Sequence, residues 1–201
     1  MPAVRLSYFD FAGGRGEDCR IALHLAGVPF EDHRVRGPAW QAFKPETPWG
    51  GMPVLTLDGK GMIAHSNAIL RFVGSQHGLH PSDPWEAALH DGVMDAVEDL
   101  RCVVNRTLGM DDEAKRASRE AMAKDEIPAW FAHLEALIGD GPFLSGSTLC
   151  VADLKIFVVR RWFTAGVLDH IPTDVVAPFA KVTRLAEAVA AHPGVVSWYA
   201  R

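Results

Sequence analysis

The sequence predicts a small α/β domain in residues 1–77, a linker in residues 78–84 and an all-helical domain in residues 85–201. Two observations support this division. Apolar and polar residues alternate in short segments of the first part, as is typical of strands, whereas in the last part apolar residues recur at helical spacing and no convincing strand is found. Two prolines, Pro81 and Pro84, mark the linker between the two patterns.

The first domain is predicted to begin with a strand–helix–strand unit. Residues 3–8 alternate between apolar and polar side chains and form the first strand. A break at Gly13 precedes a helix that ends near Gly27. Residues 30–35 form the second strand, and because a helix connects the two strands, we expect them to be parallel.

A hairpin and one more helix complete the first domain. Residues 53–57 and 60–64 are predicted strands, and the Asp58-Gly59 turn between them makes the pair antiparallel. Ser66 is predicted to be the N-cap of a helix that runs to about Gly74. This order of elements, βαβ followed by ββα, is the thioredoxin-like layout of a small mixed sheet flanked by helices.

The second domain is predicted to contain four long helical segments. Residues 85–108 form an amphipathic helix, and residues 112–138 form another that Pro128 should kink or break. Residues 151–166 are strongly apolar and indicate a buried helix, and residues 175–192 form the last one.

Composition and charge exclude several classes of protein. The net charge of the 201 residues is −5 at pH 7, whereas a nucleic-acid binder needs a basic face. No apolar run approaches the roughly 18 residues that span a bilayer. The first residues lack the pattern of a signal peptide. The three cysteines are far apart without a CxxC pair, so we expect small buried thiols, no disulfide, no metal site and a cytoplasmic location.

Short motifs in the first domain resemble those of the cytosolic glutathione transferases, and the resemblance covers essentially the whole chain. The motifs follow the order and spacing of that family: Leu6–Phe9, Gly13–Arg15, Trp40 with Lys44, Gly51–Leu55 and Ser66–Ile69. The best match is to the sigma class, which includes glutathione-dependent prostaglandin D synthases. The resemblance implies the glutathione transferase fold, with glutathione as co-substrate in the detoxifying conjugation of a small hydrophobic electrophile.

Tyr8 is the catalytic residue that the resemblance implies. The thiol of glutathione is mostly protonated at neutral pH, and its thiolate is the nucleophile. A phenolic O–H at the end of the first strand can donate a hydrogen bond to the sulfur and lower the pKa of the thiol. The only other tyrosine, Tyr199, lies near the C-terminus. Taken alone, Tyr8 is better interpreted as a half-buried strand residue with a satisfied hydroxyl, and the surrounding motifs favour the catalytic role.

Glutathione-binding residues also follow from the resemblance. Trp40 and Lys44 would reach the glycine carboxylate through an indole N–H and an ammonium. Arg15 would lie near the sulfur, although the segment between Tyr8 and Arg15 is one residue longer than the family pattern. Gly51 precedes Met52-Pro53, where the family has a cis peptide.

A cis bond at Pro53 would let the Met52 backbone pair with the cysteinyl segment of glutathione, while a trans proline at a strand start is the alternative. Ser66, at a helix N-terminus, would bind the γ-glutamyl carboxylate. His65 stands where the family usually has glutamine, which can make binding weaker or pH-dependent.

The helix after the linker is expected to line the twofold interface of a homodimer. Its acidic residues, Asp91, Asp95, Glu98 and Asp99, could simply form a solvated face. In the resembling family, the residue that matches Asp99 approaches the γ-glutamyl ammonium in the partner subunit. Trp49 would be buried against the partner.

The electrophile site is expected between the domains, bounded by Phe9, Arg101 and Arg106. The two arginines indicate a polar or anionic acceptor if they do not point into solvent. Asp153 resembles the acidic member of a helix-capping motif in which Cys150 replaces the usual Ser or Thr, and we interpret it as structural.

Three alternatives remain open at this point. The chain could catalyse a glutathione-dependent isomerisation or peroxide reduction instead of conjugation. It could be a ligand-binding or structural relative that has lost turnover. It could use Cys19 for thiol exchange, although Cys19 falls inside a helix and not at its N-terminus.

Overall fold

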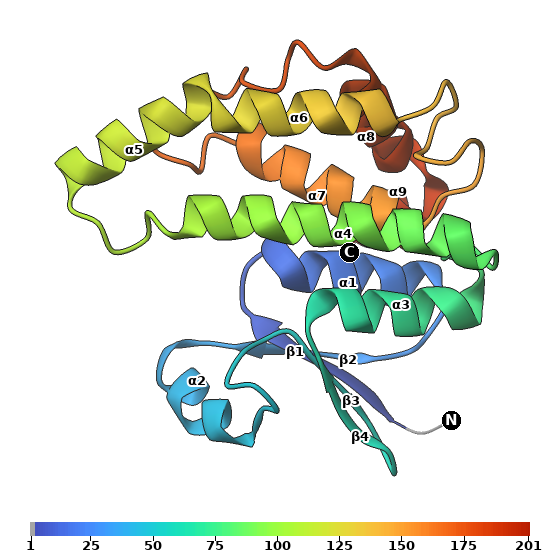
Figure 1. Cartoon of the computed structure of the whole chain (residues 1–201). Helices are drawn as coiled ribbons and strands as arrows, with labels where there is room; N and C mark the ends of the chain where they lie inside the picture. The colour runs from blue at the N-terminus through green and yellow to red at the C-terminus, as the bar shows by residue number, and fades with distance from the viewer. Residues whose placement is uncertain (1–2) are drawn as a thin grey trace.

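The computed structural model describes residues 3–201. Its N-terminal part is a four-stranded sheet with helices packed on it (Figure 1). Its elements are β1 (Val4–Phe9), α1 (Gly14–Leu25), β2 (Glu31–Val35), α2 (Gly37–Phe43), a 3₁₀ turn (Lys44–Glu46), β3 (Val54–Leu57), β4 (Gly61–Ala64) and α3 (Ser66–His77). The strand order is β2-β1-β3-β4, with β1 parallel to β2 and antiparallel to β3. The predicted mixed sheet is therefore confirmed.

The rest of the chain is helical. Its elements are α4 (Pro84–Asn105), α5 (Asp112–Lys124), α6 (Glu126–Leu137), α7 (Val151–Thr164), α8 (Ala180–Ala191) and α9 (Pro193–Tyr199). The break expected near Pro128 occurs three residues earlier at Asp125, which leaves the helical region of backbone dihedral angles. Within residues 3–201, no helix has the length and apolar character required to cross a membrane.

Sequence patterns did not predict α2 and α9, which have seven residues each. So short a helix offers less than two full turns of periodicity, and each of the two has a proline, Pro38 or Pro193, in its first turn. A third correction concerns α3, which continues to His77 and begins at Ser66 itself. His65, not Ser66, occupies the N-cap position, and no side chain caps the helix.

One apolar core joins the two halves of the molecule. α1 and α3 lie between the sheet and the helices α4 and α7, whereas α2 lies on the side turned away from them (Figure 1). The contact between α3 and α7 is close at Gly74, where a Cβ atom would lie 3.2 Å from Cγ1 of Val151. Leu6 of β1 and Leu154 of α7 belong to the same buried cluster. The N-terminus of α1 is thereby fixed against the helical domain.

Candidate active site

Tyr8 lies near the end of β1 with its hydroxyl at the N-terminus of α1. Its side chain is 5% exposed. Gly14 is the first residue of α1, has a φ of +61°, and would place a Cβ atom 2.9 Å from the Tyr8 hydroxyl. A glycine is needed there both for the backbone conformation and for the space. The first turn of α1 thus packs directly on the phenol.

The electrostatic surroundings keep the Tyr8 hydroxyl protonated. Burial raises the pKa of Tyr8 above its ordinary value, and the nearby positive charges of Arg15 and Arg101 only partly offset this effect. The backbone N–H of Arg15 acts in the same direction as these charges. At neutral pH the hydroxyl is therefore protonated and can donate a hydrogen bond.

A cavity of about 860 Å³ opens beside Tyr8. It is bounded by the first turn of α1, the C-terminal end of α4, the start of α5, the middle of α7 and Tyr199 of α9. Apolar walls come from Phe11, Leu108, Met110 and Val158, among others. A space of this size, apolar with a few polar groups, is typical of a small-molecule site.

Several cations line the same cavity, and most are already paired. Nε of Arg119 donates to the Thr107 hydroxyl at 2.8 Å, and its Nη1 donates to the backbone oxygen of Asp169 at 3.1 Å. Arg161 differs. Its guanidinium carbon lies 4.6 Å from the ring centroid of Tyr199, and among residues 3–201 no carboxylate forms an ion pair with it. Arg161 is the cation that an incoming ligand could bind.

The electrophile residues chosen from sequence are only partly placed at this cavity. Phe9 does not line it and instead packs edge-on against Tyr8 and Trp40. Arg106 is exposed and does not line it either. Arg101 does line the cavity, but its guanidinium is bound to carboxylates behind the wall. Phe11 and Arg161, which the sequence analysis did not select, line the cavity instead of Phe9 and Arg106.

Residues expected at the two carboxylates of glutathione lie on surface segments around the sheet. Trp40 belongs to α2, and Lys44 follows it in the 3₁₀ turn. The Lys44 side chain passes Gly50, where a Cβ atom would lie 3.6 Å from Lys44 Cε. Trp40 is partly buried and packs edge-on against Phe9 of β1, whereas Lys44 is exposed. The unpredicted helix α2 therefore holds Trp40 against β1.

The segment before β3 has the predicted peptide geometry. The Met52–Pro53 bond is cis, as expected. Gly51 and Met52 are partly exposed, and Pro53 is buried at the start of β3. Among the predicted glutathione-binding residues, only Arg15 also lines the cavity beside Tyr8.

Two neighbouring residues at the start of α3 differ sharply in exposure. His65 is exposed, has a φ of +68°, and lies with its ring centroid 6.3 Å from that of Trp49. Ser66 is 3% exposed, and its hydroxyl accepts a hydrogen bond from the Lys155 ammonium at 3.2 Å. The free N–H groups at this helix end favour an anion.

The acidic residues of α4 differ in exposure. Asp91 is bound to Arg71, and Asp95 accepts a hydrogen bond from Asn67 at 2.5 Å but has 62% of its side chain exposed. Glu98 points into the protein. Asp99 is exposed and has no ion-pair partner within the described part of the chain. Asp95 and Asp99 therefore face solvent, and of the two only Asp99 lacks an ion pair among the described residues.

A buried charge network lies between α1, α3, α4 and α7. Lys155 of α7 is fully buried, and its ammonium contacts Glu98 Oε1 at 2.5 Å and Asp18 Oδ2 at 3.6 Å. Arg101 binds both oxygens of Asp18, at 2.6 and 3.0 Å, and also Glu98 at 2.9 Å. Arg15 closes the network through a 2.5 Å contact between its Nε and Glu98 Oε2.

Glu98 is the centre of this network and is strongly held in its charged form. Burial alone would raise the pKa of Glu98, but the charges of Lys155 and Arg101 outweigh it and lower the pKa to about 2. Sequence analysis placed Glu98 on the helix surface and did not identify Asp18 or Lys155. A lysine inside the apolar segment 151–166 was the available signal, because a lysine buried in a helix needs anionic partners.

The structure also shows the surroundings of Cys19 and Asp153. Burial raises the pKa of the Cys19 thiol far above its usual range, which argues against thiol exchange at Cys19. Asp153 is structural: its carboxylate accepts the N–H groups of Leu144 and Cys150, each at 2.8 Å. The Cys150 sulfur completes this capping box by accepting the Asp153 N–H.

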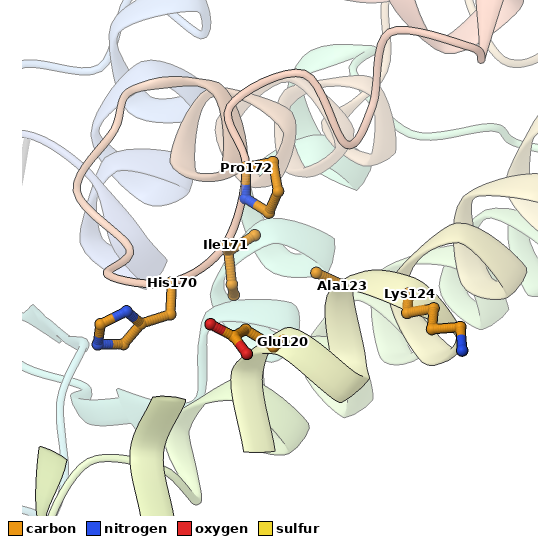
Figure 2. Close-up of a pocket in the computed structure, with 6 residues that line it drawn as sticks. All are labelled: Glu120, Ala123, Lys124, His170, Ile171 and Pro172. Carbon is orange, nitrogen blue, oxygen red and sulfur yellow. The ribbon is translucent and has the colours of Figure 1, made fainter. Parts of the chain in front are cut away.

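A second cavity, of about 540 Å³, lies between α5 and the segment that follows α7 (Figure 2). Figure 2 shows Glu120 facing Ile171, while Lys124 points away from the space between them. None of its lining residues is shared with the cavity beside Tyr8. It contains no hydroxyl or thiol nucleophile and is not the candidate active site.

Comparisons with known proteins identify the family of this chain. Models of the glutathione S-transferase N-terminal and C-terminal domains match residues 9–82 and 98–201. Glutathione S-transferase 1 of Ascaris suum is 30% identical over 207 residues, covering 100% of this chain and 97% of the relative. Hematopoietic prostaglandin D synthase of Gallus gallus is 29% identical, covering 98% and 96%. The solved structure of prostaglandin synthase D of Nilaparvata lugens is 30% identical, with a TM-score of 0.88 and coverage of 100% and 98%.

Proposed function

Because the chain belongs to the glutathione S-transferase family, we propose that it activates the thiol of glutathione with the Tyr8 hydroxyl and transfers it to an electrophile in the neighbouring cavity. The chain is accordingly an enzyme, a glutathione transferase. The observation that supports the role of Tyr8 is its position: a protonated hydroxyl at the N-terminus of α1, beside a cavity of about 860 Å³.

The chemistry follows from this position. Glutathione loses its thiol proton to solvent, and the sulfur remains as an anion that accepts a hydrogen bond from Tyr8. The positive end of α1 and the charge of Arg15 stabilise the same anion. The thiolate then attacks an electrophilic carbon of the acceptor, a C–S bond forms, and the leaving group departs with the electron pair of the broken bond. Positioning both reactants in one site supplies much of the rate.

Glutathione would lie along the edge formed by α2, the Met52–Pro53 segment and the start of α3. In this arrangement Trp40 and Lys44 bind the glycine carboxylate. The Met52 backbone, between Gly51 and Pro53, pairs with the cysteinyl segment. His65 and Ser66 bind the γ-glutamyl group, whose carboxylate is suited to the N-terminus of α3.

The acceptor is proposed to be apolar over most of its surface and to have an anionic group. Phe11, Leu108 and Met110 provide the apolar contacts. Arg161, which has no carboxylate partner within residues 3–201, would bind the anionic group. This revises the earlier assignment of an anionic subsite to Arg101 and Arg106.

A cytoplasmic homodimer of the sigma class is the proposed state of the enzyme. Asp99 is exposed on α4, where it could reach the γ-glutamyl ammonium in a second subunit. Trp49 is 76% exposed, and Trp85 and Leu89 are exposed one turn apart near the start of α4. Exposed apolar side chains of this size are expected to be covered by a partner.

Glutathione-dependent isomerisation is the second candidate, because two relatives are named prostaglandin synthases. Conjugation consumes glutathione in proportion to product, whereas isomerisation returns it unchanged. Mass spectrometry of the products, with glutathione measured before and after, separates the two reactions.

The test of the proposed function compares the wild type with Tyr8→Phe. We expect the wild type to bind glutathione-agarose and to conjugate a chromogenic chlorodinitrobenzene. Tyr8→Phe should retain binding and circular dichroism but lower turnover at least tenfold, since the hydroxyl is worth about 1.4 kcal/mol or more to the reaction. Binding without turnover over a broad panel of electrophiles would favour a non-catalytic carrier. Unchanged turnover in Tyr8→Phe would remove the tyrosine from the mechanism.

A further inference from the structure

The charge network behind the Tyr8 cavity contains more groups than a single ion pair, and Asn67 links it to the exposed Asp95. It contains three cations (Arg15, Arg101, Lys155) and two carboxylates (Asp18, Glu98), so its net charge is +1. Removing charges from water is costly, and the charges of its four least exposed members, Asp18, Glu98, Arg101 and Lys155, balance one another. The excess positive charge is that of Arg15, whose side chain is 28% exposed and which lines the cavity.

Burial lowers the pKa of Lys155 below its ordinary value, with Asp18 and Glu98 opposing this effect, and the contacts of its nitrogen are those of an ammonium. Its nitrogen lies 2.5 Å from Glu98 Oε1, 2.5 Å from Asn67 Oδ1 and 3.2 Å from Ser66 Oγ. The Ser66 hydroxyl in turn lies within 3.4 Å of Glu98 Oε1, to which it can donate. Three acceptors around one nitrogen use the three donors of a charged lysine. The amide nitrogen of Asn67 faces Asp95, which fixes its oxygen toward Lys155.

The network extends to the proposed thiolate position. Arg15 of the network is bound to Glu98 on one side and lines the cavity with Tyr8 on the other. Arg101 lines that cavity as well. The charges of Arg15, Arg101 and Asp18 all act on the Tyr8 hydroxyl. A charge change at Asp18 therefore acts on the Tyr8 hydroxyl, and Lys155 is linked to the same site through Asp18 and Glu98.

Building on the proposed function, we infer that the Asp18–Lys155 pair is a positioning device for the reaction: it sets the net positive charge of the network and thereby how readily bound glutathione ionises. The positive charge of Lys155 offsets part of the negative charge of Glu98. The potential that Arg15 and Glu98 together produce at the sulfur is therefore more positive. Asp18 opposes this effect. Neither residue touches the substrate, and both act through Glu98, Arg101 and Arg15.

The other ionisable groups around the network are few. From α1, Cys19 lies with its sulfur 4.0 Å from the Ser66 backbone oxygen, and burial keeps its thiol neutral. From α4, the Cys102 sulfur lies 3.8 Å from Arg15 Nη2. Glu17 faces the cavity but is bound to Arg20 and Trp198. From β1, Tyr8 faces the network, whereas Arg5 lies on an exposed part of the strand and is paired with Glu31.

The two members of the pair have opposite charges, which provides a signed test. Lys155→Gln lowers the network charge from +1 to zero and should raise the pKa of the bound thiol by about one unit. Asp18→Asn raises the network charge to +2 and should lower that pKa by a similar amount. The double variant restores +1 and should return the pKa to within a few tenths of the wild-type value.

The measurement is the ultraviolet absorbance of the glutathione thiolate bound to each protein, titrated with pH, together with the pH profile of kcat/KM for glutathione. Arg5→Gln is the control, because it also removes one positive charge but lies on an exposed part of β1 paired with Glu31. It should leave the thiol pKa unchanged. Circular dichroism and thermal unfolding report whether each variant is folded.

The outcomes separate the inference from the function on which it rests. If the wild type shows no bound thiolate, the proposed function fails and the inference with it. If the wild type shows one but Lys155→Gln and Asp18→Asn leave its pKa unchanged, or shift it in the same direction, the inference alone is overturned. If Lys155→Gln does not fold, Asp18→Asn decides, because damage to the site cannot make the thiol a stronger acid.

Discussion

Gly16 lies against the ring of Tyr8 so closely that a Cβ atom there would overlap Cβ, Cγ and Cδ1 of the tyrosine. The Tyr8 ring therefore occupies the space that a side chain at position 16 of α1 would need. The rings of Phe9 and Phe11 also contact the Tyr8 ring, and together with Gly16 they restrict its orientation.

Gly16→Ala is therefore expected to displace Tyr8. The overlap should cost about 1–3 kcal/mol of unfolding free energy and lower turnover at least tenfold, because the hydroxyl moves away from the sulfur. Chemical denaturation and the chlorodinitrobenzene assay measure the two effects. Gly92→Ala is the matched control: Gly92 is a helical glycine in α4 with no atom within 4 Å of its added Cβ, so stability should rise by about 0.4–1 kcal/mol. Wild-type turnover in a folded Gly16→Ala protein would contradict the packing argument.

Replacing Glu98 should make stability less sensitive to acid. The folded pKa of Glu98, about 2, lies below its ordinary value of 4.5, so its contribution is present above pH 4.5 and is lost as the pH falls toward 2. Because the carboxyl is only partly exposed, that contribution is about 2–3 kcal/mol. We expect Glu98→Gln to be less stable than the wild type at pH 7 and nearly equal to it near pH 2. A difference that does not change between these pH values would show that Glu98 stabilises the fold without its charge.

The capping box of α7 makes a separate prediction about stability. Asp153→Ala leaves the N–H groups of Leu144 and Cys150 without their acceptors, and burial prevents water from replacing them. The expected loss of unfolding free energy is about 2–4 kcal/mol. Asp140→Ala, at an exposed site, should change it by less than about 0.5 kcal/mol. Equal effects at the two sites would contradict the structural role of Asp153.

Arg161 should select acceptors by charge. Arg161→Gln is expected to lower kcat/KM about tenfold for a chloronitrobenzene that has a carboxylate and to leave the uncarboxylated analogue within about twofold, because a charged hydrogen bond is worth about 1.5–3 kcal/mol and is partly screened in an open cavity. The matched control is Arg106→Gln, which removes an exposed arginine outside the cavity. An equal loss for both acceptors would show that Arg161 supports the cavity wall and does not bind a charge.

The sequence predicted most of the N-terminal fold because its signals are local. Alternation in residues 3–8 and a two-residue turn at Asp58-Gly59 determine strands and a hairpin within a few residues of one another. Tyr8 and the cis Met52–Pro53 bond came from the family resemblance, not from periodicity. The seven-residue helices α2 and α9 were missed because they are shorter than the pattern that identifies a helix.

The charge network and the cavity wall could not be predicted for the opposite reason. Asp18 and Lys155 are 137 positions apart in sequence, and nothing local indicates that they meet. Phe9 is the last residue of β1, whereas Phe11 lies in the bend that follows it. Strand alternation therefore does not predict which of the two rings lies at the cavity. Arg101 and Arg161 are both arginines on long helices, yet one is bound by Asp18 and the other has no carboxylate partner within residues 3–201. Only tertiary structure separates them.

The most direct test of the central claim is a crystal structure of this chain with glutathione bound. The sulfur is expected within hydrogen-bonding distance of the Tyr8 hydroxyl, with the γ-glutamyl carboxylate at Ser66 and the N-terminus of α3. A sulfur that contacts another donor while Tyr8 faces elsewhere would contradict the account, whatever the turnover of the enzyme.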